Sequence, residues 1–228
     1  MTNPSTIPSV LPIFPLTGVL LLPGSRLPLH VFETRYRHMT EDALENDGFI
    51  GVIQPYAATP PVIDLDDPSQ DLAAATEEPA VYEIGCAGEI EQWERLPDGR
   101  YYILLVGVAR FRVEKELPLQ RGYRRVEASY QEFSVDAEDR AAEISPRPLL
   151  DALRAFGDQH GIGIELDRLG ELSGLALLNS IAMGLPFPPA EKQALLEAAD
   201  IASRQEMLLT LLEMGLQRST DGVEPVLH

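Results

Sequence analysis

The sequence has little lysine and almost no cysteine. Lys115 and Lys192 are the two lysines among 18 basic residues, and Cys86 is the one cysteine. A single thiol forms no intramolecular disulfide, and its apolar neighbours predict a buried structural cysteine. No stretch reaches the roughly 20 apolar residues of a membrane span, and the N-terminus lacks the basic residues and cleavage site of a signal peptide. We therefore expect a cytoplasmic protein that does not contact a membrane.

Motifs for catalysis are also missing. No G-x-x-x-x-G-K-[ST] phosphate loop, G-x-S-x-G elbow or Cys/His cluster with zinc spacing occurs, and the four histidines are scattered. The acids Asp64, Asp66 and Asp67 lack the glycine and terminal glutamate of an EF-hand loop. The sequence therefore predicts no catalytic residues, no metal site, no cofactor and no enzyme activity.

Basic charge is scarce as well. The 36 acidic residues outnumber the 18 basic ones and give a net charge of -18, which repels phosphate backbones. Nucleic acid is therefore not the expected partner. With 228 residues, of which 45% are hydrophobic, the chain can bury one substantial core or two small ones.

The prediction of the fold starts from the stretch between Leu11 and Glu33. Pro15, Pro23 and Pro28 within it exclude one long helix, because proline lacks an amide donor and clashes with the preceding turn. The pattern predicts a strand, a loop with an apolar tip at Val19–Leu22, and a second strand at Leu27–Phe32, which leads into a helix. An acidic stretch, Ala57–Pro79, predicts a mobile solvated loop.

Further elements follow the same reasoning. Apolar residues at helical spacing from Tyr36 to Leu44 predict the helix, which ends at Asn46-Asp47-Gly48. Strands are expected at Phe49–Gln54, at the two arms of a hairpin around Asp98-Gly99 (Val81–Arg95 and Arg100–Val113), and at Arg124–Phe133. These predict a small mixed β-barrel over residues 1–135.

From Ser145 the pattern is helical. Helix starts are indicated at Ser145-Pro146, Ser173, Pro188-Pro189 and Asp200, each followed by apolar residues three or four apart. The sequence predicts a helical bundle over residues 145–218 and a flexible tail at 219–228.

Three segments resemble one known family. They are LPIFPLTGVLLLPGSRLPLHVFE, LPDGRYYILLVGVARFRV and LPFPPAEKQALLEAADIASRQEMLLTLL, and together they cover roughly Leu11 to Gly215. The chain resembles the N-terminal substrate-recognition domain of ATP-dependent Lon proteases. The resemblance implies an α+β fold, in which a PUA-like pseudo β-barrel is followed by a C-terminal α-helical bundle. It also implies a free-standing Lon-domain protein that recognises substrates without hydrolysing them, because the catalytic serine and lysine of these proteases lie in a separate downstream domain.

The leading hypothesis is a non-catalytic module that binds unfolded or client polypeptide segments, or docks them to a partner such as a protease or chaperone. An exposed apolar tip at Val19–Leu22 would supply the contact surface. The alternative is that its leucines fill the barrel mouth or pack against the bundle. The candidate residues are Val19, Leu20, Leu21, Leu22, Phe32 and Tyr36.

A PUA-like fold also suggests RNA binding. Trp93 and Tyr101, with Tyr102 beside them and Arg95 and Arg100 alongside, would stack on bases. The net charge opposes this hypothesis, and the same aromatic residues also fit as packed partners across the hairpin.

Overall fold

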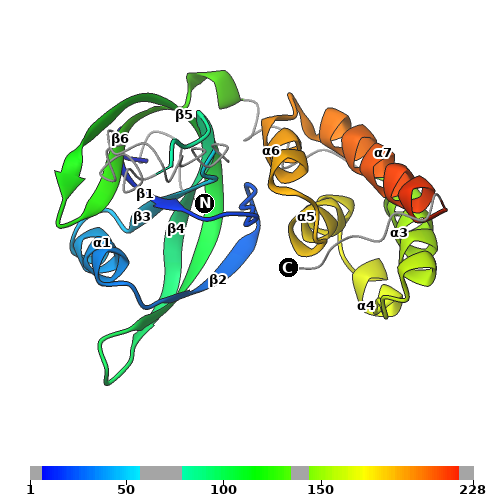
Figure 1. Cartoon of the computed structure of the whole chain (residues 1–228), viewed down its shortest axis with the longest axis horizontal. Coiled ribbons are helices and arrows are strands. Elements are labelled where there is room, and N and C mark those ends of the chain that lie inside the picture. The colour runs from blue at the N-terminus through cyan, green and yellow to red at the C-terminus, as the bar shows by residue number, and fades with distance from the viewer. Residues whose placement is uncertain (1–6, 57–78, 135–143, 221–228) are drawn as a thin grey trace, which may run out of the picture.

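A computed structural model describes residues 7–56, 79–134 and 144–220. A six-stranded sheet with one helix, α1, forms one part of the molecule, and a group of helices packs beside it (Figure 1). The protein is therefore an α+β structure, as predicted. The predicted acidic loop lies outside the described residues except for Pro79, and the predicted tail does so from residue 221 onward.

The sheet contains two hairpins and one parallel pair. Its order is β2-β5-β4-β3-β1-β6, and β6 also pairs with β5. Strand β1 runs parallel to β3, and the other pairs are antiparallel. The strands are β1 (Val10–Pro15), β2 (Arg26–Val31), β3 (Phe49–Ile53), β4 (Ile84–Arg95), β5 (Tyr101–Gln120) and β6 (Tyr123–Ser129).

The predicted hairpin is confirmed, but its second arm is longer than expected. Gly99 takes a positive φ of 84° in the turn between β4 and β5. Strand β5 continues past Val113 to Gln120 because β6 pairs with its second half, from Arg112 opposite Ser129 onward. This half was not predicted as a strand because its residues are mostly polar. They are polar because this part of β5 extends beyond the core.

Helix α1 (Thr34–Glu45) follows β2 as predicted. Its buried residues include Tyr36, Met39 and Ala43, and the Tyr36 ring lies 4.2 Å from that of Phe14 on β1. Gly48, with a φ of 76°, turns the chain into β3. The recurrence of apolar residues at every third or fourth position thus identified both the helix and its buried face.

The four predicted helices are confirmed. Two of them have a side-chain cap, since Ser173 Oγ accepts from Ala176 N and Asp200 Oδ1 accepts from Ser203 N. Ser145 precedes the first helix but its side chain makes no capping hydrogen bond. The helices are α3 (Pro146–His160), α4 (Leu166–Gly170), α5 (Gly174–Gly184), α6 (Pro189–Glu197) and α7 (Ile201–Thr220). The short α4 was not predicted, because five residues are too few to show a helical period. The strand predicted at Arg124–Phe133 is wrong at its end, since β6 stops at Ser129 and Gln131–Phe133 form the 3-10 helix η3.

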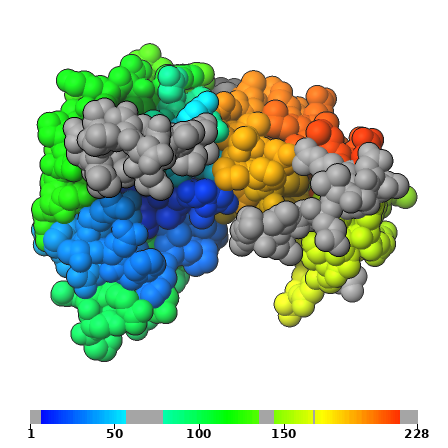
Figure 2. Space-filling model, in the orientation of Figure 1, coloured from blue at the N-terminus to red at the C-terminus, as the bar shows by residue number. Residues whose placement is uncertain are grey.

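One hydrophobic cluster joins the sheet and the helices. It includes Leu21 and Leu105 from the sheet side and Leu178 and Leu195 from the helices. Space-filling contact between the two parts is visible along their upper border (Figure 2), while below it the surface is hollowed. The division into subdomains at 1–135 and 145–218 stays a prediction.

Buried polar groups fix helix α6 against the sheet. Gln54 Nε2 donates to Pro189 O at 2.9 Å, where α6 begins, and Gln193 Nε2 donates to Ile84 O at 3.0 Å. The fully buried Arg110 of β5 donates to Leu196 O at 3.0 Å, at the end of α6. A cation is favoured there, because the carbonyl end of a helix carries partial negative charge.

Candidate functional site

The predicted apolar tip is buried. Leu20, Leu21 and Leu22 are 3%, 1% and 0% exposed, and Val19 is half-buried. Two glycines that face each other on β4 and β5, Gly88 and Gly107, leave room for these side chains. A Cβ at Gly107 would lie 2.2 Å from Leu22 O, and one at Gly88 would lie 3.0 Å from Leu21 Cδ2. The tip is therefore not the exposed surface of the leading hypothesis. Its leucines are part of the core, as in the alternative interpretation.

Helix α5 closes over this loop. Asn179 is 3% exposed, and its Nδ2 donates to Pro23 O at 3.2 Å. A buried carbonyl needs a hydrogen-bond partner, so this contact satisfies the turn that follows the leucines. Helix α5 therefore covers the loop for which the sequence did not decide between an exposed and a buried position.

Three aromatic rings lie exposed at the end of β2. Phe32 is 61% exposed and Tyr102 is 50% exposed. The His30 ring stacks on Tyr102 with centroids 4.7 Å apart, and it lies 5.9 Å from the Phe32 ring. His30 is also the cross-strand partner of Tyr102. We call His30, Phe32 and Tyr102 the aromatic surface.

The alternation of β2 explains why these rings face solvent. Leu27, Leu29 and Val31 turn toward the core, so that Pro28 and His30 lie on the opposite, exposed face. An antiparallel sheet with one solvated face usually presents polar residues there. Aromatic side chains at this position therefore mark the face as a candidate contact surface.

Charged residues border the aromatic surface. Arg26 on β2 forms an exposed ion pair with Glu91 on β4, with Nη2 and Oε1 2.7 Å apart. Such a pair contributes little to stability in water, but it links β2 to β4 across the intervening β5. Glu94 lies opposite Tyr102 on β4 and is exposed. The border is thus mixed in charge with a carboxylate next to the rings.

Tyr36, another predicted contact residue, belongs to the core. The Arg35 guanidinium lies over its ring at 4.6 Å, and the ring packs on Phe14. Burial raises the pKa of its hydroxyl. Of the six predicted contact residues, Phe32 is the one whose side chain is largely exposed.

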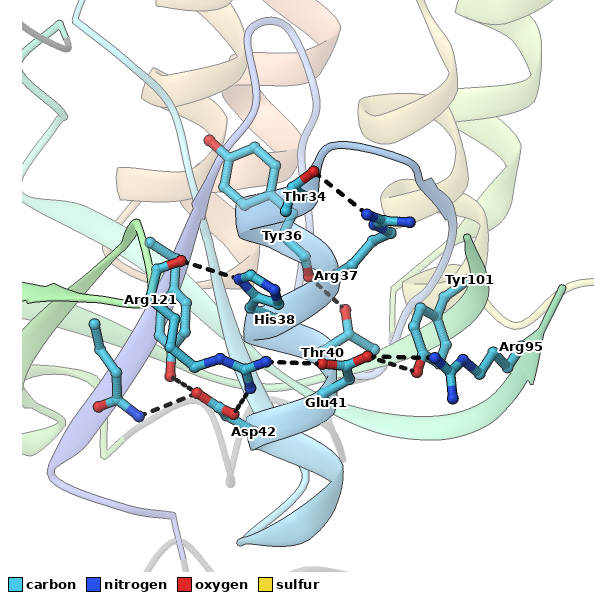
Figure 3. Close-up of polar contacts among 12 residues, drawn as sticks. Thr34, Tyr36, Arg37, His38, Thr40, Glu41, Asp42, Arg95, Tyr101 and Arg121 are labelled. Atoms are coloured by element: carbon cyan, nitrogen blue, oxygen red, sulfur yellow. Dashed lines mark hydrogen bonds and ion pairs between the residues drawn. The ribbon is translucent and has the colours of Figure 1, made fainter. Parts of the chain in front are cut away.

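The two predicted base-stacking residues lie in different surroundings. Trp93 is 56% exposed, whereas Tyr101 is 3% exposed. The Arg95 guanidinium lies 5.8 Å from the Tyr101 ring, and Tyr101 Oη donates to Glu41 Oε1 at 3.4 Å (Figure 3). Burial and the Glu41 carboxylate raise the pKa of Tyr101. Tyr101 has no free face for a base, and the neighbouring carboxylate would repel phosphate.

A second polar cluster joins α1 to the β5–β6 turn. Asp42 accepts from Tyr123 Oη at 2.7 Å, from Gln120 Nε2 at 3.1 Å and from Arg121 (Figure 3). Burial acts to raise the pKa of Asp42, but these hydrogen bonds outweigh it and leave the pKa below its usual value. A pocket of about 290 Å³ lies beside this cluster. Because every Asp42 contact is internal, the cluster fixes the turn against α1.

Within residues 7–56, 79–134 and 144–220, no group of three or more histidine, cysteine, aspartate or glutamate residues is placed to bind a metal ion. The single cysteine, Cys86, is buried, as the sequence predicted.

No helix in the described part of the chain combines the length and the hydrophobicity needed to cross a bilayer.

Comparisons with known proteins agree with the resemblance of the three sequence segments. Residues 10–214 match the family described as the ATP-dependent protease La (LON) substrate-binding domain. Lon protease 2 of Myxococcus xanthus is 29% identical over 93% of this chain and 24% of its own length. Lon protease of Anaeromyxobacter dehalogenans is 28% identical, with the same coverage. The chain thus spans about a quarter of the length of these curated relatives.

Solved structures show the same fold. A Lon N-terminal domain protein from Xanthomonas campestris superposes with a TM-score of 0.58 at 26% identity, over 88% of this chain and 97% of its own. The N-terminal domain of a Mycobacterium avium complex Lon protease gives a TM-score of 0.57 at 17% identity, over 90% and 98%. The chain belongs to the Lon substrate-binding domain family.

Proposed function

We propose that this protein binds exposed apolar segments of other polypeptides at the aromatic surface and performs no chemistry on them. The observation that carries the proposal is the exposure of Phe32 and Tyr102 on a sheet face that alternation would make polar. Aromatic side chains bring a large apolar contact area at low entropic cost, which suits recognition of varied sequences.

The family supports a role in substrate recognition. The matching family is named for substrate binding, and the match covers about a quarter of the length of the relatives. We infer that the bound segments belong to client polypeptides handed to a protease or chaperone in the cytoplasm. The predicted PUA-like pseudo-barrel is retained as part of the proposal, supported by the pairing of β6 back to β5.

Binding of a permanently unfolded protein tests the proposal. Fluorescein-labelled lysozyme, reduced and carbamidomethylated, keeps its positive charge and exposes apolar segments. We expect saturable binding by fluorescence anisotropy, and an affinity about tenfold weaker for Phe32→Ser, since one buried aromatic contact contributes about 1.4 kcal/mol or more.

Leu119→Ser is the matched control. Leu119 is also 61% exposed but lies at the β5–β6 turn, away from the aromatic surface. Its replacement should leave the affinity unchanged. Equal binding by wild type and Phe32→Ser, or no binding by wild type, would contradict the proposal. Labelled single-stranded RNA at low salt should not bind; salt-sensitive binding would favour the RNA alternative.

A further inference from the structure

Strand β2 has a free edge beside the aromatic surface. Among the described residues β5 is its one partner strand, and β2 stands at the end of the sheet order. It lies on the side of the sheet that faces the helices (Figure 1), where the molecular surface is hollowed (Figure 2). An edge strand presents unpaired N–H and C=O groups, which can pair with another extended chain.

The register shows which groups are free. Gly107 N donates to Ser25 O at 2.9 Å, next to the pair of Arg26 and Val106. Hydrogen-bonded positions alternate along an antiparallel pair, so Leu27, Leu29 and Val31 turn their backbone groups to β5. The backbone groups of the intervening residues, Arg26, Pro28 and His30, point to the free edge.

Proline at the central edge position agrees with this register. Pro28 lacks an N–H and would break the ladder if it faced β5. The edge therefore offers three carbonyls, of Arg26, Pro28 and His30, and the two N–H groups of Arg26 and His30. Proline reduces pairing between two such edges, since their central groups are then both acceptors, while a different chain can still supply donors.

Charge selects the occupant. The chain carries a net charge of -18, which attracts positively charged segments and repels a second copy of itself. Glu94 lies opposite Tyr102 of the aromatic surface and is exposed, whereas the charge of nearby Glu91 is balanced by Arg26. A client segment with basic residues is therefore favoured at this edge.

We infer that β2 binds an extended, basic client segment as an additional strand, with alternate apolar side chains of the segment resting on the aromatic surface. This inference rests on the proposed function and specifies how it operates. Backbone pairing would supply an affinity that does not depend on sequence, and the rings of Phe32 and His30 would select apolar side chains.

Peptides that lack N–H groups on one edge test strand addition directly. The probe is a fluorescein-labelled eight-residue peptide in which valine alternates with lysine. Two N-methylated versions carry methyl groups on the valines or on the lysines, so that each blocks one edge. We expect one version to bind wild type about tenfold more weakly or worse, and the other to bind like the parent.

A matched pair of substitutions tests the edge from the protein side. His30→Pro and His30→Ala both remove the ring, but His30→Pro also removes the outward N–H while leaving the hydrogen bonds to β5 intact. We expect His30→Pro to bind the parent peptide about tenfold more weakly than His30→Ala. Thermal unfolding of both variants verifies that they fold, and the peptide experiment stands on wild type alone if His30→Pro does not.

The outcomes separate this inference from the proposed function. If both methylated peptides bind like the parent, strand addition is wrong; an effect of Phe32→Ser on unfolded lysozyme would then leave the proposed function intact. If wild type binds neither the parent peptide nor unfolded lysozyme, both fail.

Discussion

Two apolar segments that are close in the sequence lie in different environments, one in the core and the other at the surface. Leu20, Leu21 and Leu22 lie in the core, whereas Phe32, ten residues later, is largely exposed. The leucines enter a space left by the facing glycines Gly88 and Gly107. Phe32 follows a strand whose inward positions are already filled by other side chains. The surroundings of each segment, rather than its hydrophobicity, determine whether it is available for binding.

The difference bears on function, because an apolar run in the sequence does not identify a contact surface. The leucine loop stabilises the sheet and gives α5 a place to pack. The aromatic surface is small and contributes little to the core. Substitutions in the two segments should therefore affect different properties, stability in one and binding in the other.

The largest expected effect is on stability at the loop. Leu22→Ala should lower the free energy of unfolding by about 3 kcal/mol, since it removes a fully buried side chain and leaves a cavity. Urea unfolding followed by circular dichroism measures this value. Folded Leu22→Ala should bind unfolded lysozyme like wild type; a selective loss of binding would contradict the comparison.

Gly107→Ala tests the space that the loop occupies. Its Cβ would meet the carbonyl oxygen of Leu22 at 2.2 Å, so the backbone must shift and we expect a loss of about 2 kcal/mol. The matched control is Gly184→Ala, because a Cβ there meets no atom within 4 Å. If thermal unfolding gives equal melting temperatures for the two variants, the close packing at Gly107 is wrong.

Asn179→Ala tests the cover that α5 places on the loop. The substitution removes the donor to Pro23 O, and we expect a loss of about 1 kcal/mol. The effect is modest because Asn179 Oδ1 has no hydrogen-bond partner in the described structure and its removal offsets part of the cost. Faster amide hydrogen exchange at residues 20–25 is the matching local measurement, and unchanged exchange would argue against this role of α5.

The smallest effect on stability is expected at the aromatic surface. Phe32→Ser should change the free energy of unfolding by at most about 0.5 kcal/mol, because the side chain is mostly in water. A small change in the free energy of unfolding together with a loss of binding would show that Phe32 contacts the client and does not stabilise the fold. A destabilisation as large as that of Leu22→Ala would show that Phe32 is part of the core.

Local elements were predictable because they depend on neighbours in the chain. The period of α1, the turn at Gly99 and the capping residues Ser173 and Asp200 each depend on spacing or on a preferred backbone conformation. The extension of β5 to Gln120 was missed, because its polar second half becomes a strand through pairing with β6. Of the predicted contact residues, Phe32 is exposed, but no sequence period distinguished it from the buried Tyr36.

The sequence alone indicated most of the strands, α1 and the four longer helices, and it contains the three segments that resemble the family. Gly88 and Gly107 stand in that sequence, but only the paired strands show that together they leave room for a neighbouring segment. Tertiary structure decided which apolar residues fill that space and which remain outside. Exposure depends on what packs against a side chain, and Leu22 and α5 are separated by about 150 residues of chain, a distance no local pattern spans.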